Sequence, residues 1–324
     1  MTTQTWTILT LLQWTEQFFQ KKGLDSPRLD AELLLANCLK LTRVQLYTNF
    51  ERPINEAELA QFKALIQRRA NREPLAYITG EKDFFSLPFR IRPGVLIPRP
   101  ETELIVELGI SVIASPTGVA ISPIRQKRLL HPAGFAMTDM PLYNDTIKIL
   151  DIGTGSGCIL ISLLKNLASS TGIAMDVSPE AIACAQENAA FHGVLERIQW
   201  INRDFTNFDQ PEFDHAFDLI VANLPYVSSD EIEGLMPEVA KFEPRKALVA
   251  KNHGLDLIFQ LINRLRNWLK PTGKALLEIG ATQGKACLEF ISKNSYLQAK
   301  LHQDLAHHDR VLEIEIVQRD NCQT

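Results

Sequence analysis

The sequence predicts an α/β fold in which a mostly parallel, seven-stranded sheet is covered by helices on both faces. From residue 147 onward, short apolar runs alternate with amphipathic stretches of helical length. A glycine-rich turn follows the first apolar run, as expected where a strand leads into a helix. The last two runs are joined only by Leu305–Arg310, which is too short for a crossover helix. The last strand is therefore expected to be antiparallel.

The individual elements follow from the same alternation. The expected strands are Lys148–Asp151, Ile173–Asp176, Ile198–Asn202, Phe217–Ala222, Ala275–Ile279, Ala299–Asp304 and Val311–Val317. The expected helices between them cover residues 157–168, 179–192 and 254–269.

The first part of the chain has a different, purely helical pattern. Apolar residues recur every three to four positions until Gly23, which breaks the first helix. Ser26-Pro27 opens a second helix, and Asn55 precedes a third whose first turn is acidic. We predict a helical bundle over residues 1–73 and interpret it as a substrate-docking domain; the alternative is a cap that only adds stability.

Two further regions follow this bundle along the chain. Residues 74–100 predict a hairpin linker, and residues 101–324 form the expected catalytic domain. Within that domain, residues 114–146 show no sustained periodicity and several prolines, so we predict a flexible insertion there.

Composition excludes several classes of protein. Apolar residues make up 45% and charged residues 22% of the 324, and no apolar stretch has the length of a membrane span. The first 75 residues hold 10 basic and 8 acidic side chains and the rest hold 24 and 30, so neither part favours direct nucleic-acid binding. The five cysteines form no CxxC pair, and a cytoplasmic protein without a membrane partner is expected.

The glycine-rich turn is the first candidate site. Its glycines are spaced Gly-X-Gly-X-Gly, which differs from the dinucleotide pattern, and no lysine follows as in a phosphate-binding loop. An acid precedes the turn, where it can lie near the ammonium group of a methionine. These features favour S-adenosylmethionine as cofactor. The predicted cofactor residues here are Asp151, Gly153, Thr154, Gly155, Ser156 and Gly157.

Two further acids end the next strands. Asp176 is placed to accept both hydroxyls of a ribose, although it could instead cap the following helix. Asp204 and Phe205 suit an adenine, one by hydrogen bonding and the other by packing, although Phe205 could instead belong to the core.

The second candidate site is Asn223-Leu224-Pro225-Tyr226, which closes the apolar run Phe217–Ala222. The Asn223 amide oxygen and the Leu224 carbonyl can each accept one hydrogen of a planar NH2 group. Pro225 would shape the turn, and Tyr226 would cover the group. We predict that these four residues bind substrate and carry catalysis, with Asn223 also beside the cofactor; the alternative is an ordinary strand-to-loop turn.

One cluster invites a metal interpretation that we do not adopt. His307-His308-Asp309 lies on a tight link between strands, where adjacent side chains point apart, and no second Cys/His cluster completes a site. No metal is expected.

Several segments together resemble the release factor glutamine N5-methyltransferases (PrmC/HemK family), class I enzymes dependent on S-adenosylmethionine. The matching segments are Pro74–Gly80, Leu96–Glu103, Asp151–Gly157, Asp176–Ala181, Asn223–Tyr226, Phe242–Arg245 and Asp309–Val311. There are two departures. The family usually has proline where this chain has Leu224, and residues 114–146 are longer than usual.

The resemblance implies a Rossmann-like methyltransferase sheet with a helical N-terminal domain. It also implies a substrate, the glutamine of the Gly-Gly-Gln motif in class I peptide-chain release factors, and N5-methylglutamine as product. Three alternatives stay open: a ribosomal-protein glutamine methyltransferase, an adenine-N6 nucleic-acid methyltransferase, and a non-catalytic binding module.

Overall fold

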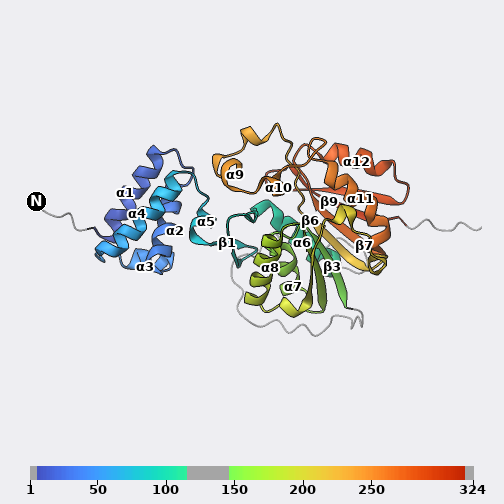
Figure 1. Cartoon of the computed structure of the whole chain (residues 1–324), viewed down its shortest axis with the longest axis horizontal. Helices are drawn as coiled ribbons and strands as arrows, with labels where there is room; N and C mark the ends of the chain where they lie inside the picture. The colour runs from blue at the N-terminus through green and yellow to red at the C-terminus, as the bar shows by residue number, and fades with distance from the viewer. Residues whose placement is uncertain (1–5, 115–145, 318–324) are drawn as a thin grey trace, which may run out of the picture. The chain divides into compact units, whose positions relative to one another are not determined.

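The computed structural model describes residues 6–114 and 146–317 (Figure 1). The insertion predicted at 114–146 lies, apart from its two end residues, outside this part of the chain. Two compact units are present. The first holds the described residues up to Lys82, with Arg90–Ile97 and Glu231–Arg245; the second holds Asp83–Phe89 and the remaining described residues. The domain boundaries predicted from sequence are continuous and therefore differ from this division in where Glu231–Arg245 is placed.

The first unit is built mainly of helices. They are α1 (Ile8–Lys21), α2 (Pro27–Leu39), α3 (Arg43–Thr48), α4 (Glu56–Ala70), α5 (Leu75–Thr79) and α9 (Pro237–Phe242). Asn55 caps α4 through a reciprocal pair of hydrogen bonds with Glu58, and Pro27 opens α2 at its first position. The two short helices α3 and α5 were not predicted.

A buried cation joins Glu231–Arg245 to the N-terminal helices of this unit. The guanidinium of Arg69 is bonded to Asp30 at 2.7 Å and to Glu238 at 3.1 Å, and all three side chains are nearly buried. Arg72 adds a second contact with Glu238 at 3.2 Å. Removing one partner of such a set would leave a buried charge unpaired, which is costly.

A hairpin is divided between the two units, with Asp83–Phe89 in the second and the residues on either side in the first. Its strands are β1 (Glu81–Phe84) and β2 (Leu87–Arg90), as the sequence predicts for residues 74–100. Phe85 and Ser86 at its tip have φ values of 50° and 61°, as a two-residue turn with the twist of a hairpin requires. The Phe85 N–H is bonded to the Glu103 carboxylate at 2.8 Å.

The second unit contains the predicted seven-stranded sheet, in the order β5-β4-β3-β6-β7-β9-β8. Its strands are β3 (Ile147–Ile152), β4 (Ser170–Asp176), β5 (Ile198–Asn202), β6 (Phe217–Ala222), β7 (Leu269–Glu278), β8 (Leu297–Gln303) and β9 (Asp309–Ile316). The pairs among β3 to β7 are parallel, whereas β9 is antiparallel to both β7 and β8. The predicted antiparallel last strand is confirmed.

Helices cover both faces of this sheet. They are α6 (Glu103–Ala114), α7 (Cys158–Asn166), α8 (Pro179–Phe191), α11 (Asp256–Trp268) and α12 (Gly284–Ser292); the short helix α10 (Arg245–Leu248) precedes α11 in the chain. Gly109 of α6 lies so close to Leu219 and Leu276 that a Cβ would come within 3.2 Å of the first and 3.7 Å of the second. The neighbouring residues Ile220 and Leu277 point to the opposite face, as alternation along a strand requires.

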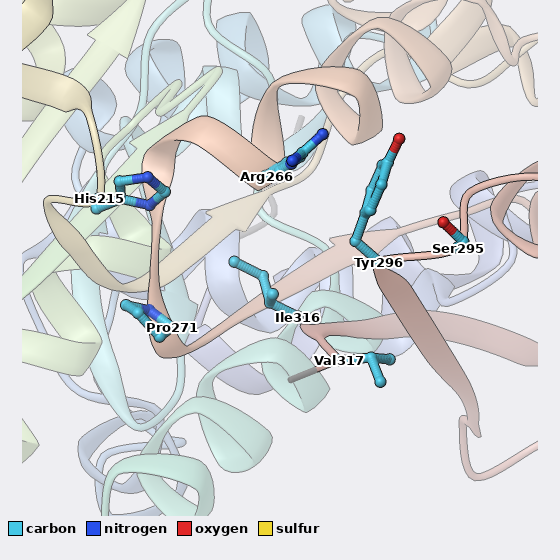
Figure 2. Close-up of a pocket in the computed structure, with 7 residues that line it drawn as sticks. All are labelled: His215, Arg266, Pro271, Ser295, Tyr296, Ile316 and Val317. Atoms are coloured by element: carbon cyan, nitrogen blue, oxygen red, sulfur yellow. The ribbon is translucent and has the colours of Figure 1, made fainter. Parts of the chain in front are cut away.

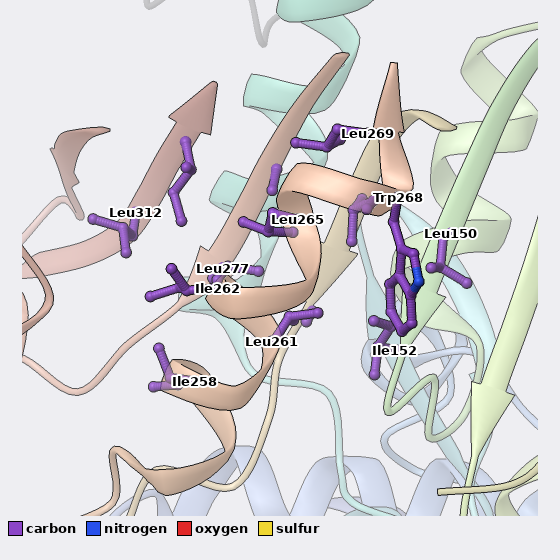
Figure 3. Packing of buried hydrophobic residues seen from close by; sticks show 14 of the residues in the cluster. Leu150, Ile152, Ile258, Leu261, Ile262, Leu265, Trp268, Leu269, Leu277 and Leu312 are labelled. Atoms are coloured by element: carbon purple, nitrogen blue, oxygen red, sulfur yellow. The ribbon is translucent and has the colours of Figure 1, made fainter. Parts of the chain in front are cut away.

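That opposite face carries a core cluster of buried residues (Figure 3). Helix α11 contributes one stripe of buried residues at three-to-four spacing, from Ile258 to Trp268. These side chains pack on Leu150, Leu277 and Leu312 from three strands. Helix α12 was missed from sequence, because it is only nine residues long and begins at Gly284, a residue type that usually marks a loop.

Candidate functional site

The predicted site residues gather at the carboxyl edge of the sheet in the second unit. Strands β3 and β6 are neighbours, although they are separated in sequence by two strand–helix units. The chain order reverses between them, and ligands of open α/β sheets bind at such a switch point. The glycine-rich turn follows β3, Asp176 ends β4 and Asn223 follows β6.

The turn after β3 needs its glycines for conformation and for packing. Gly153, Gly155 and Gly157 have φ values of 73°, 56° and 79°, which disfavour residues with a Cβ. A Cβ on Gly157 would lie 2.8 Å from the Ile161 side chain. The N–H groups of Gly153 and Thr154 bond to the carbonyl of Met175 at the end of β4, which ties the turn to the neighbouring strand.

Asp151 lies fully buried beneath this turn. Its Oδ2 accepts a hydrogen bond from the Thr154 hydroxyl at 2.7 Å, whereas its buried Oδ1 has no partner among the described residues. Burial raises the pKa of this carboxyl to about 7, the Thr154 bond opposes the shift, and the nearby charge of Asp176 adds to it. An unpaired buried oxygen beside an open turn suits a cationic ligand.

Asp176 holds the turn in place and does not cap α8. Its Oδ2 accepts from the Gly155 N–H and its Oδ1 from the Ser178 N–H, both at 2.9 Å. The N-cap of α8 is Ser178, whose side chain accepts from Ala181. Partial burial raises the pKa of Asp176.

Val177, which the sequence reasoning did not single out, is 56% exposed directly beside Asp176 and offers an apolar surface.

Asp204 and Phe205 lie at the start of the 3-10 turn η3 (Phe205–Asn207) after β5. Asp204 is exposed and accepts from the Thr206 N–H and hydroxyl through the same oxygen. Phe205 is 5% exposed and belongs to the core cluster. The core alternative for Phe205 is therefore the one its burial favours, and adenine contact by these two residues stays a prediction.

Asn223 is held in one orientation by a residue far away in sequence. Its Nδ2 donates to the Thr102 hydroxyl at 3.0 Å. No described residue donates to the Asn223 Oδ1 or to the Leu224 carbonyl, so both acceptors are available. The Leu224 side chain is 5% exposed and packs in the core against the glycine-rich turn, where a Cβ on Gly153 would lie 3.4 Å away.

Tyr226 is fixed at both ends. Its hydroxyl donates to Glu278 Oε1 at 3.2 Å, and its carbonyl accepts from Gln283 Nε2 at 2.9 Å. Gly254 lies so close that a Cβ there would be 1.8 Å from the Tyr226 carbonyl oxygen. Burial and the Glu278 charge raise the pKa of the phenol, so Tyr226 stays a neutral hydrogen-bond donor.

Thr102, Glu278 and Gln283 are site residues that the sequence reasoning missed. Glu278 ends β7 and is 1% exposed, and its Oε2 accepts from Thr102 at 2.6 Å. The one available signal was a carboxylate directly after the apolar run Ala275–Leu277, at the same edge as the other site residues. Thr102 lies in Leu96–Glu103, one of the segments that carry the resemblance, but no role was predicted for it.

A cavity of about 270 Å³ lies elsewhere in the second unit. Its lining includes Pro271 near the start of β7 and Ile316 at the end of β9, both labelled in Figure 2, and none of the predicted site residues. In the described ranges, no three His, Cys, Asp or Glu side chains form a metal-ligand group. Nor does any helix in residues 6–114 and 146–317 have the length and apolarity to cross a membrane.

A mostly parallel sheet with this glycine-rich turn, together with a match to a methyltransferase family, identifies the second unit as a methyltransferase domain. Residues 149–242 match the methyltransferase domain family, and residues 10–80 match the PrmC N-terminal domain. A solved structure of the hMettl16 catalytic domain in complex with MAT2A 3'UTR hairpin 6 superposes with a TM-score of 0.50 at 16% identity. It covers 76% of this chain and 80% of that one and supports the fold alone.

Full-length relatives identify the family. A release factor glutamine methyltransferase of Geobacter sulfurreducens is 37% identical over 95% of this chain and 96% of its own length. One of Rhodopirellula baltica is 34% identical over 96% of each chain. The chain belongs to the release factor glutamine methyltransferase family, so it is a methyltransferase, as predicted.

Proposed function

We propose that this enzyme transfers a methyl group from S-adenosylmethionine to the side-chain amide nitrogen of the glutamine in the Gly-Gly-Gln motif of class I peptide-chain release factors. The observation that carries this assignment is the orientation of Asn223. With Nδ2 directed at Thr102, the Oδ1 of the same amide has no donor among the described residues and would accept an N–H of a substrate NH2 group. Family membership supports the same substrate.

The described residues fit the cofactor. The left-handed glycines 153, 155 and 157 leave the backbone of the turn open to a ligand, and the unpaired Asp151 Oδ1 lies just below. Asp176 would bind the ribose, and we assign the adenine contact to Asp204, Phe205 and Val177. Thr154 and Ser156 complete the turn. When bound, S-adenosylmethionine supplies an electrophilic methyl group on a sulfonium sulfur.

The protein's part in the reaction is positioning and charge stabilisation. Asn223 Oδ1 and the Leu224 carbonyl would each accept one hydrogen of the glutamine amide, which aims its nitrogen at the methyl group. Pro225 shapes the turn, and Tyr226 covers the amide and excludes water. The methyl group replaces one amide hydrogen, which leaves as a proton. Orientation of this kind can supply up to about 7–11 kcal/mol of a barrier.

The substrate is a folded protein, and we assign its docking to the N-terminal helices predicted at residues 1–73. Residues 74–100 would serve as linker and residues 101–324 as catalytic domain. Because release factors act during translation, we place the reaction in the cytoplasm.

The decisive experiment is mass spectrometry after incubation of the enzyme with S-adenosylmethionine and a class I release factor. One added methyl on the Gly-Gly-Gln peptide is expected. Parallel reactions with ribosomes and with adenine-containing RNA test the two alternatives. Methylation of a ribosomal protein or of adenine, with an unmodified release factor, would overturn the assignment.

A further inference from the structure

A chain of hydrogen bonds joins the acceptor turn to one buried carboxylate. Asn223 Nδ2 donates to Thr102 Oγ1 at 3.0 Å, and Thr102 Oγ1 donates to Glu278 Oε2 at 2.6 Å. The other oxygen of Glu278 accepts from the Tyr226 hydroxyl at 3.2 Å. Glu278 is therefore linked to both ends of Asn223–Tyr226, to Tyr226 directly and to Asn223 through Thr102, although it lies 52 positions beyond Tyr226 in the sequence.

The direction of this chain follows from the number of protons available. A threonine hydroxyl has one hydrogen, and the ionised carboxylate can only accept, so Thr102 must give its hydrogen to Glu278. Only the lone pairs of Thr102 then remain, and they require a donor. Asn223 meets that requirement with its NH2 group, which leaves its oxygen facing the substrate.

We propose that Glu278 and Thr102 are positioning residues that set the orientation of the Asn223 amide and thereby make the acceptor site specific for an NH2-bearing group. If Glu278 were neutral, its own O–H would donate to Thr102. The Thr102 hydrogen would then be free to donate to Asn223, and the reversed amide would present NH2 to the substrate NH2. The inference rests on the proposed function and extends it to substrate selection.

The surroundings of Glu278 keep its two protonation states close in energy. Thr102 and Tyr226 donate to it, and Arg310 on β9 adds a positive charge; all three lower its pKa. Glu101 adds a negative charge that raises the pKa, and the Cys158 thiol on α7 also lies within electrostatic range. Burial is the largest effect, and together these groups raise the pKa of Glu278 to about 7. Arg310 is itself fixed by Asp304 at 3.2 Å.

The first test is the pH profile of a single turnover at saturating release factor and S-adenosylmethionine. For the wild type we expect the rate to rise with pH as Glu278 ionises. Glu278→Gln removes the ionisation, so its rate should be about tenfold below that of the wild type at pH 8 and should not change with pH. An unchanged rise in Glu278→Gln would assign the ionisation to another group and overturn the inference.

Thr102 offers a matched pair of variants. Thr102→Val has nearly the same shape and removes both hydrogen bonds, so we expect a loss of about tenfold or more in rate with unchanged affinity for S-adenosylmethionine. Thr102→Ser retains the hydroxyl and should retain both the rate and the pH profile. Equal rates for the valine and serine variants would overturn the relay.

A measurement without turnover separates this inference from the proposed function. The side-chain NH2 group of Asn223, identified by its loss in Asn223→Ala, should shift in nitrogen–proton NMR spectra as Glu278 titrates. The shift should be present in Thr102→Ser and absent in Glu278→Gln and Thr102→Val. If the wild type shows this titration but leaves release factors unmethylated, the proposed substrate fails and the relay stands. An Asn223 resonance indifferent to pH and to both substitutions overturns the relay, whatever the substrate.

Discussion

The two halves of the site are built by different means. The cofactor half consists of a local turn, in which glycines with positive φ, peptide N–H groups and the nearby acids Asp151 and Asp176 lie within 26 residues of one another. The acceptor half depends on side chains from three distant segments, around residues 102, 223 and 278. The comparison teaches that a binding turn can be encoded locally, whereas the orientation of one amide requires the assembled sheet.

If the acceptor half works by orientation, Asn223→Ala should have the largest effect of any substitution considered. We expect turnover to fall by about 10²–10³-fold, because a preorganised acceptor is lost, while the Kd for S-adenosylmethionine changes little. Single-turnover rates and binding calorimetry measure the two quantities. Asn166→Ala is the control. It also loses one hydrogen bond, to the Ser162 carbonyl, but Asn166 lies at the end of α7 that is away from the glycine-rich turn. Near-normal methylation by Asn223→Ala would remove the basis of the comparison.

The packing behind the acceptor turn gives the next prediction. Gly254→Ala places a Cβ 1.8 Å from the Tyr226 carbonyl, and its φ of 80° is itself unfavourable. We expect a loss of roughly 3 kcal/mol or more in the free energy of unfolding, or displacement of Tyr226 with loss of activity. Gly193→Ala has a similar φ of 70° but open space, so it should lose only about 1–2 kcal/mol. Denaturant titration compares the two; equal losses would show that Tyr226 is not tightly held.

The cofactor half should show its own dependence on pH through Asp151. Its pKa of about 7 in the folded state exceeds the unfolded value of about 3.9. Stability contributed by the protonated carboxyl is therefore present below pH 4 and is lost as pH rises to 7 and above. Relative to the wild type, Asp151→Asn should gain about 2–3 kcal/mol in free energy of unfolding between pH 5 and pH 8. Denaturant titrations at both values test this, because the other titrating groups cancel in the difference. If the difference in free energy of unfolding between the variant and the wild type is the same at both pH values, Asp151 is not a buried carboxyl without a second partner.

The smallest expected effect is that of Asp176→Asn. The amide keeps one acceptor oxygen for two backbone N–H donors, so the glycine-rich turn should loosen and the Kd for S-adenosylmethionine should rise about tenfold. The rate at saturating cofactor should stay within about threefold, since the acceptor half is untouched. Asp218→Asn is the control, because Asp218 also accepts a backbone N–H, from Lys148, but lies at the amino end of β6, away from the site. A large fall in saturated rate would show that the two halves are not separable.

Much of the fold could be predicted because its determinants are local. The seven strands are apolar runs with recognisable ends, the short link 305–310 forces an antiparallel pair, and Asn55 with Glu58 forms a cap within four residues. Helix α12 and the membership of Glu231–Arg245 in the first unit could not be predicted. The first is short and begins at a glycine, and the second depends on the ion pair of Arg69 with Glu238, which lies 169 positions further along the chain.

The sequence by itself determined the class of sheet and the glycine-rich turn, and it predicted the acceptor residues, because the signals for each are residues close together along the chain. Only the tertiary structure decided which atom of the Asn223 amide is directed at Thr102. That choice depends on a hydroxyl and a carboxylate brought in by other elements, and on burial that no local pattern reports. The physical reason is that an amide has two nearly equivalent orientations, and only its hydrogen-bond partners distinguish them.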